Sequence, residues 1–256
     1  MGNRNTKAYL KLREQIQEAF DFVYVVSQAV PCMKLQISLI DKGEINDLPA
    51  PDYFTKPNPL DQISAQVKGY KSELSKYILL SSFSYFESFI VDVIEEVMAI
   101  NGGPDEFAKK TKEIATKTIQ SQGNSYSKQK VTLSKQEAHE RDRRLLATSK
   151  LTENNFVFPS SLLSHLGVKA LSQKLGNLKS VDIPKLMQDA FCMEWNDDDV
   201  KGFHQMRETR NRVAHGKTVN LSVKDVVEMN TRLRDIAHKV DQHLIDKVLI
   251  SEPFRL

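Results

Sequence analysis

Glycine, proline and cysteine are scarce in this 256-residue sequence. With 10 glycines and 9 prolines, it has too few turn-forming residues for a loop-rich β-sandwich, so helices are favoured. Its two cysteines, Cys32 and Cys192, cannot form a disulfide scaffold, and they lack the Cys-x-x-Cys spacing of a zinc module. We expect both to be ordinary buried thiols of a cytosolic protein.

Long apolar runs and a strong excess of one charge are missing as well. The longest apolar runs, such as residues 22–26, fall far short of the roughly 20 residues that span a bilayer. The net charge is only +3, which by itself predicts no partner. There is no glycine-rich phosphate loop, nucleophile elbow or kinase signature either. We therefore expect a cytoplasmic protein that has no membrane partner and no ATP-dependent or serine-hydrolase chemistry.

Apolar residues at helical spacing predict long helices in the first part of the chain. One helix starts near Ala8, and we expect Pro31 to end or kink it. Residues 33–46 are ambiguous, because apolar residues alternate over 33–39 as in a strand. A proline-containing connector leads to a helix of about forty residues from Leu60, which ends at the Asn-Gly-Gly-Pro sequence of 101–104.

The last third of the sequence predicts two further helices. Acidic residues at 197–199 favour a helix start, and Gly216 favours its end. Ser222 is the expected N-cap of a final amphipathic helix. The predicted fold is all-α, an up-and-down helical bundle. Residues 1–59 would form an N-terminal helix and connector packed on a bundle of residues 60–256, which an irregular insertion interrupts at about 103–195.

Basic residues accumulate in this insertion. Residues 105–150 contain eleven Lys or Arg and six acidic residues, a net charge of +5, which leaves −2 for the rest of the chain. Such a segment is either a solvated surface or an arm that contacts RNA phosphates. The residues that we expect to bind RNA are Lys128, Lys130, Arg141, Arg143 and Arg144.

One short motif precedes the final helix: Arg210-Asn211-Arg212-Val213-Ala214-His215-Gly216. On an ideal helix, Arg210 falls in the apolar sector, although a guanidinium is always charged and costly to bury without a partner. Asn211 and His215 are four residues apart and share another face, and Arg207 lies one turn before Asn211. This polar cluster at a helix end is the candidate functional site.

The motif resembles the Arg-x(4–6)-His signature of the HEPN superfamily, often followed, as here, by glycine. HEPN proteins are helical bundles that carry this motif near the end of the penultimate helix. The stretch SYFESFIVDVIEEV is similar to an early core helix of that superfamily, which often carries a glutamate, here Glu87. The size resembles the larger prokaryotic, defence-associated branch, similar to RiboL-PSP-HEPN and MAE-type proteins.

The resemblance implies a metal-independent endoribonuclease that needs no cofactor and acts as a toxin or antiphage defence effector. His215 would be the acid or base, Arg210 would bind the scissile phosphate, and Asn211 would orient either one, with Glu87 and Arg207 in support. Residues 210 and 215 lie about 140° apart on a straight helix. They converge only if the helix unwinds near Gly216, or if a homodimer brings Arg210 of one protomer to His215 of the other.

Other interpretations remain open at this point. Arg210 could be a core arginine paired with Glu87, and His215 could be a cation that complements the helix dipole. A metal site of His204, Glu208 and His215 is conceivable, but its spacing is not a familiar ligand pattern, and we expect no metal. The alternative function is a non-catalytic HEPN module that binds RNA or a partner, such as an antitoxin or another protein of a defence system.

Overall fold

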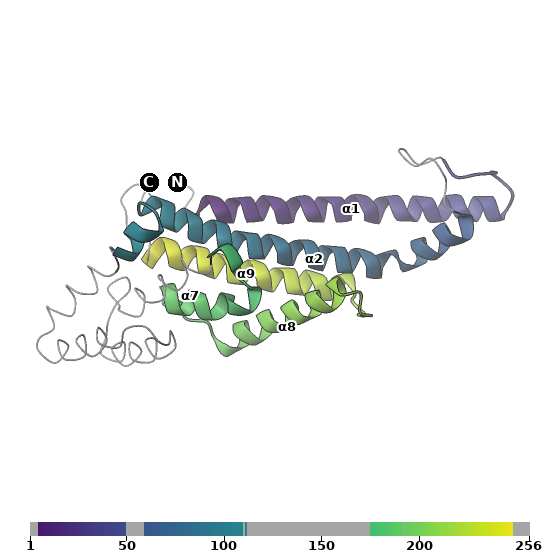
Figure 1. Ribbon diagram of the computed structural model, residues 1–256. Coiled ribbons are helices and arrows are strands. Elements are labelled where there is room, and N and C mark those ends of the chain that lie inside the picture. The colour runs from purple at the N-terminus through teal and green to yellow at the C-terminus, as the bar shows by residue number, and fades with distance from the viewer. Residues whose placement is uncertain (1–4, 50–58, 110, 112–174, 192, 248–256) are drawn as a thin grey trace, which may run out of the picture. The chain divides into compact units, whose positions relative to one another are not determined.

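The computed structural model describes residues 5–49, 59–109, 111, 175–191 and 193–247. Every regular element in these ranges is a helix, and they contain no strand, which confirms the predicted all-α class. The α-helices are α1 (Lys7–Asp41), α2 (Leu60–Ile100), α7 (Ile183–Phe191), α8 (Asp197–Ala214) and α9 (Val223–Lys247) (Figure 1). Short 3-10 helices cover Leu175–Asn177 and Ser180–Asp182.

The chain divides into two compact units, and α1, α2, α8 and α9 each contribute to both. The first unit contains Met1–Leu12, Phe86–Arg207 and Arg234–Leu256. The second contains Arg13–Tyr85 and Glu208–Leu233. The predicted division of the chain near residue 59 is a different one and stays a prediction.

Aromatic side chains form much of the core of the first unit. The rings of Phe86 and Phe203 lie 5.7 Å apart between centroids and join α2 to α8. Phe89 continues this core, with its ring 6.1 Å from that of Phe86 and 6.1 Å from that of Tyr9 at the start of α1. Aromatic side chains bury large areas, so this cluster supplies much of the hydrophobic stabilisation of the unit.

Polar groups fix the first turn of α1 in the same unit. The carboxylate of Glu96 in α2 accepts hydrogen bonds from the backbone N–H groups of Lys7 (3.0 Å) and Ala8 (2.9 Å). The hydroxyl of Thr6 accepts one from the backbone N–H of Tyr9 at 3.1 Å, as an N-cap does. The same hydroxyl donates to the buried carboxylate of Asp241 in α9 at 2.6 Å. The start of α1 is therefore bonded to two other helices.

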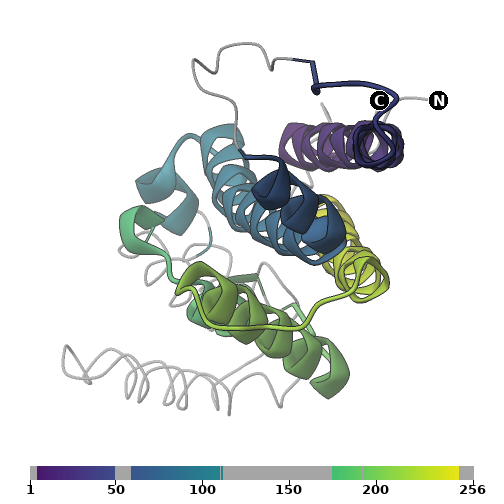
Figure 2. The ribbon, with the colours of Figure 1, turned by 90° about the vertical axis from the view of Figure 1, so that its right-hand side faces the viewer.

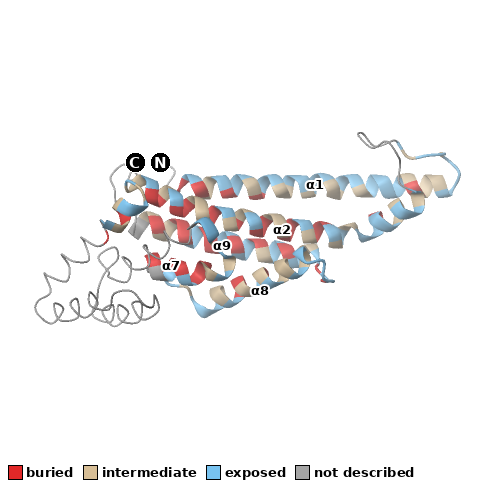
Figure 3. Ribbon diagram, viewed as in Figure 1, coloured by how far each residue is buried: buried red, intermediate tan, exposed pale blue. Residues whose placement is uncertain are grey.

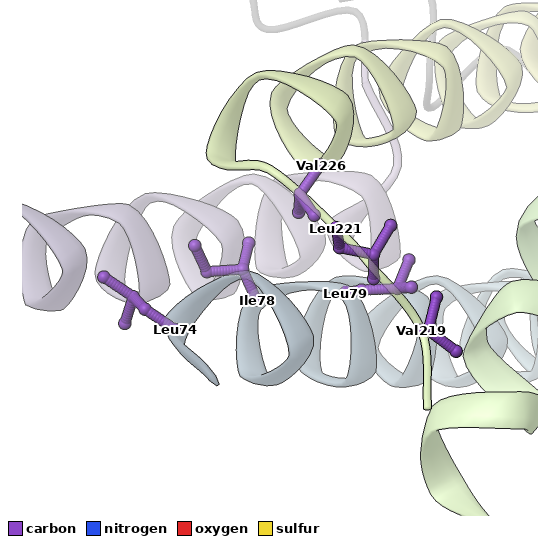
Figure 4. Packing of buried hydrophobic residues seen from close by; sticks show 6 residues of the cluster. All are labelled: Leu74, Ile78, Leu79, Val219, Leu221 and Val226. Atoms are coloured by element: carbon purple, nitrogen blue, oxygen red, sulfur yellow. The ribbon is translucent and has the colours of Figure 1, made fainter. Parts of the chain in front are cut away.

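The core of the second unit is a smaller aliphatic cluster (Figure 4). Its buried members are Leu74, Ile78 and Leu79 from α2, Val219 and Leu221 from the segment after α8, and Val226 from α9. Phe20, Val23 and Val26 of α1 pack against it. In this unit α1 is therefore held on α2 and α9 by one side only.

The predicted C-terminal ends of α2 and α8 and the predicted start of α9 are confirmed. Past the end of α2, Gly102 and Gly103 have φ of 91° and 100°, and the N–H of Gly103 donates to the carbonyl of Met98 at 2.8 Å. Ser222 caps α9, because its hydroxyl accepts from the backbone N–H of Asp225 at 3.2 Å. Asp225 in turn accepts from the backbone N–H of Ser222 at 2.9 Å, which completes a capping box.

The structure decides two points about α1 and contradicts the expectation for Cys32. Pro31 does not end the helix, whereas a kink there stays a prediction. Residues 33–41, which the sequence left ambiguous, continue α1. Ile37 is buried in this continuation, whereas Leu35 is 62% exposed. The alternating apolar residues of this segment therefore lie on opposite sides of a helix. Cys32 is exposed rather than buried, because it follows Pro31 on the outward side of α1. Cys192 lies outside the described residues.

Two helices, α1 and α2, are long and apolar enough to cross a membrane by length and composition alone. The longest uninterrupted apolar run in the sequence did not indicate such helices, because polar residues are interspersed among the apolar ones in both α1 and α2. Half of the most apolar stretch of α2 is buried within the protein, as in the core helix of a globular fold. The absence of a membrane partner stays a prediction.

Candidate functional site

The motif lies at the C-terminal end of α8, which a Schellman motif closes. The N–H of Lys217 donates to the carbonyl of Arg212 at 2.9 Å, and the N–H of Gly216 donates to that of Val213 at 3.0 Å. Gly216 has a φ of 67°, a left-handed conformation that glycine adopts readily. These bonds make His215 the last residue of the helical path and turn the chain away directly after it.

Arg210 points along an apolar surface of the second unit, as its place in the apolar sector predicted. Its guanidinium carbon lies 5.7 Å from the centroid of the fully buried Phe83 ring, within the range of a cation–π contact. Its Nη1 donates a hydrogen bond to Oδ1 of Asn211 at 3.0 Å. Arg210 is half-buried, and its Nε is enclosed by the protein.

His215 has a different environment from Arg210. It is exposed, as are its neighbours Ala214 and Gly216. Within the described part of the chain, its ring forms no hydrogen bond or ion pair. The arrangement therefore combines a held cation with an accessible imidazole at one helix end.

Unwinding of the helix does not bring these two side chains together. The backbone N–H of His215 still donates to the carbonyl of Asn211 at 3.0 Å, so the helical path continues up to His215. Arg210 and His215 thus keep the angular separation of about 140° that five helical residues impose. Unwinding of the helix therefore does not bring Arg210 and His215 together, because the chain leaves the helical path only at Gly216, after His215. Convergence across two protomers stays a prediction.

Glu87 and Arg207, the predicted supporting residues, are both half-buried and belong to the first unit. Glu87 borders an open hollow whose other lining residues include Ser88, Asp92 and Ser180. Pairing of Glu87 with Arg210 would join the two units and stays a prediction.

The conceivable metal site receives no support from the described residues, where no group of three His, Cys, Asp or Glu side chains could hold an ion. The ring of His204 instead lies 5.6 Å from that of Phe203. The five basic residues expected to bind RNA all fall outside the described residues: Lys128, Lys130, Arg141, Arg143 and Arg144.

Sequence reasoning missed the partners that hold the motif in place. One of them is Phe83 of α2, whose ring lies against the Arg210 guanidinium. The carbonyl of Thr218 accepts a hydrogen bond from Arg212 at 3.4 Å, which ties the next loop to α8. No spacing in the sequence signals the first contact, whereas the Gly216 turn makes the second one foreseeable.

In the part of the chain that the structure describes, every regular element is a helix, and the Arg-Asn-x-x-x-His motif lies at the end of the penultimate one. Residues 44–246, most of the chain, match the RiboL-PSP-HEPN family. The chain therefore belongs to this family of the HEPN superfamily, and the resemblance inferred from the motif is confirmed. Neither a curated protein nor a solved structure matches the chain.

Proposed function

We propose that this protein is a metal-independent endoribonuclease of HEPN type that acts in the cytoplasm as a toxin or antiphage defence effector. The observation that carries the proposal is the end of α8, where Arg210 is oriented by Asn211 and Phe83 and His215 is exposed five residues later. Membership of the RiboL-PSP-HEPN family supports the same chemistry.

The reaction needs a base, an acid and a cation on the phosphate. A base removes the proton of the ribose 2′-hydroxyl, the oxygen attacks phosphorus, and the bond from phosphorus to the 5′-oxygen breaks. The acid returns a proton to that oxygen, which leaves a 2′,3′-cyclic phosphate and a 5′-hydroxyl. Histidine is the side chain best suited to exchange protons near neutral pH, which assigns one of these transfers to His215.

Arg210 is suited to the phosphate. A guanidinium stays charged and donates in a planar fork, so it contacts two phosphate oxygens at once and stabilises the charge of the transition state. Its bond to Asn211 restricts the rotation of the side chain before RNA binds. This preorganisation lowers the entropy cost of placing the cation.

A homodimer would complete the site. One motif offers one histidine, whereas the reaction has two proton transfers, and Arg210 and His215 diverge within one chain. A two-fold axis at the end of α8 would bring His215 of each protomer toward Arg210 of the other. An antitoxin or another defence protein would then restrain the activity in cells.

The test is cleavage of an RNA pool in EDTA by the wild type and by the Arg210→Ala and His215→Ala variants. We expect cyclic phosphate ends from the wild type and a loss of at least about a hundredfold in rate from either variant. Arg232→Ala and His238→Ala are matched controls, because both side chains are exposed on α9 outside the motif. Cleavage that survives His215→Ala, or that EDTA abolishes, contradicts the proposal.

Growth measurements test the role as a toxin. Expression of the wild type should arrest growth, and His215→Ala should relieve the arrest at an equal level of folded protein. If the purified wild type binds RNA but leaves every pool intact, the protein is instead the non-catalytic RNA-binding module of the alternative interpretation.

A further inference from the structure

A lysine of α2 lies on the side of that helix that meets the motif. Lys76 precedes Phe83 by seven residues, two helical turns, so the two side chains leave α2 within about 20° of each other. Because the Phe83 ring contacts Arg210, this side of α2 faces α8. The Lys76 side chain is only 26% exposed, although lysine is usually well solvated. Lys76 is therefore sheltered on the same side of α2 as the contact with the motif.

The level of Lys76 along α2 is that of the end of α8. Within the second unit, α2 and α8 run in opposite directions (Figure 1). Earlier residues of α2 thus meet later residues of the α8 segment, as Leu79 does when it packs in one cluster with Val219. Lys76 lies about 10 Å before Phe83 along α2, and the same distance beyond Arg210 along α8 reaches the turn that ends the helix.

Positive charge gathers at this end of α8. Between Glu208 and Ser222 the sequence has no acidic residue, but it has three cations and a histidine: Arg210, Arg212, Lys217 and His215. Glu208 leaves α8 about 160° away from Arg210, on the side that faces away from α2. Figure 3 shows exposed residues where the chain leaves α8, so most of these charges are accessible to a ligand.

The nearby carboxylates are either occupied or weakly held. At the start of α9, Asp225 caps its own helix, and Glu228 pairs with Lys224 at 3.9 Å. On α2, the carboxylate of Glu73 lies 2.6 Å from the ammonium of Lys76, but the Glu73 side chain is 60% exposed. An ion pair this exposed is weak, so a phosphate oxygen can replace the carboxylate.

We propose that Lys76 binds a second backbone phosphate of the RNA whose scissile phosphate Arg210 binds. The inference rests on the proposed function and adds to it a residue far from the motif in the sequence. An ammonium on a flexible stem binds phosphate as a point charge, which positions a strand without reading its sequence. Glu73 holds the ammonium in place before RNA binds and gives way to the phosphate afterwards.

The Glu73–Lys76 pair makes this inference specific, because its two members should act in opposite directions. Lys76→Gln removes the cation and should weaken RNA binding. Glu73→Gln removes the carboxylate that competes with phosphate and should strengthen RNA binding. If the pair served only to stabilise α2, the loss of either member would break the same contact, and both variants would act in the same direction.

The test measures binding of the full chain to a pool of 2′-O-methyl RNA, which lacks the attacking hydroxyl and is not cleaved. We expect Lys76→Gln to weaken binding about tenfold and to reduce the slope of log affinity against log salt by about 0.7. Lys76→Arg keeps the charge and should preserve both quantities. Glu73→Gln should strengthen binding about threefold.

Two matched controls remove the same charges elsewhere in the second unit. Lys71→Gln is the control for the lysine, because Lys71 is exposed on α2 and points about 140° away from Lys76. Glu18→Gln is the control for the carboxylate, because Glu18 is exposed on α1. In the second unit, α1 and α8 lie on opposite sides of α2 in both views (Figures 1 and 2).

The outcomes separate this inference from the proposed function. If the wild type binds and cleaves RNA while Lys76→Gln changes neither affinity nor salt slope, only the role of Lys76 is wrong. An equal effect of Lys71→Gln, or weaker binding by Glu73→Gln, overturns that role as well. A wild type that binds neither this pool nor unmodified RNA contradicts both the inference and the proposed function.

Discussion

The attachment of α1 to α9 through Asp241 gives a prediction that is independent of function. The carboxylate of Asp241 is fully buried. Its Oδ1 accepts from the backbone N–H of Thr6 at 3.0 Å and from the Thr6 hydroxyl at 2.6 Å. Its Oδ2 accepts from Nδ2 of Asn5 at 2.7 Å and from Nε2 of Gln242 at 3.3 Å. Among the described residues no cation pairs with Asp241. Hydrogen bonds alone therefore replace the hydration that this charge loses on burial.

Removal of the carboxylate should be costly. Hydrogen bonds to a charged group contribute about 1.5–3 kcal/mol each, and buried donors that lose their acceptor cost about 1–3 kcal/mol. Because the four bonds share one acceptor group and are not additive, we expect Asp241→Ala to lower the free energy of unfolding by about 3–4 kcal/mol. Asp241→Asn keeps one acceptor oxygen and should cost about 2 kcal/mol.

Urea unfolding followed by circular dichroism measures both changes. The control is Asp92→Ala, because Asp92 also bonds α1, through Lys11 at 2.8 Å, but the Lys11 side chain is 56% exposed. An exposed pair contributes less than about 1 kcal/mol. Amide hydrogen exchange at residues 7–10 shows whether the start of α1 detaches first. If Asp241→Ala costs no more than Asp92→Ala, the buried hydrogen bonds do not hold α1 as argued.

Three smaller changes test other parts of the second unit. Gly216→Ala should destabilise the protein by about 1 kcal/mol, because its φ of 67° is unfavourable for alanine, and chemical denaturation would show no loss if the Schellman turn were unimportant. Gly69→Ala should instead stabilise by about 0.5–1 kcal/mol in the same assay, since Gly69 is inside α2 and an added Cβ meets nothing within 4 Å. Hydrogen bonds from the backbone and side chain of Ser222 lower the pKa of the Asp225 carboxyl below 3.8, so its cap contribution is complete above that pH and is lost as the pH falls through the folded pKa. An NMR titration of Asp225 should show this lowered pKa, and Ser222→Ala, which removes the hydroxyl but keeps the backbone N–H, should raise it only part of the way to the ordinary value.

Local signals in the sequence were sufficient for most helix boundaries. Gly102 and Gly216 stop α2 and α8 through their own backbone conformation, and Ser222 starts α9 with a bond three residues away. Such signals act within one turn of helix, so a single sequence contains them completely. The position of the motif at the end of α8 was predictable for the same reason.

Pro31 shows where local reasoning fails. Proline removes one helical hydrogen bond and favours a break, yet α1 continues because Val26 before it and Ile37 after it both pack inward. Burial on both sides of the proline outweighs its local cost. The exposure of Cys32 follows from the same continuation, since it fixes which side of α1 faces solvent.

Contacts between distant parts of the sequence could not be predicted from it. Thr6 was available as a helix cap, but its partner Asp241 lies 235 residues away, and an aspartate in an amphipathic helix is usually solvated. The support of Arg210 by Phe83 has the same character. Both contacts depend on which helices pack together, which hydrophobic periodicity does not specify.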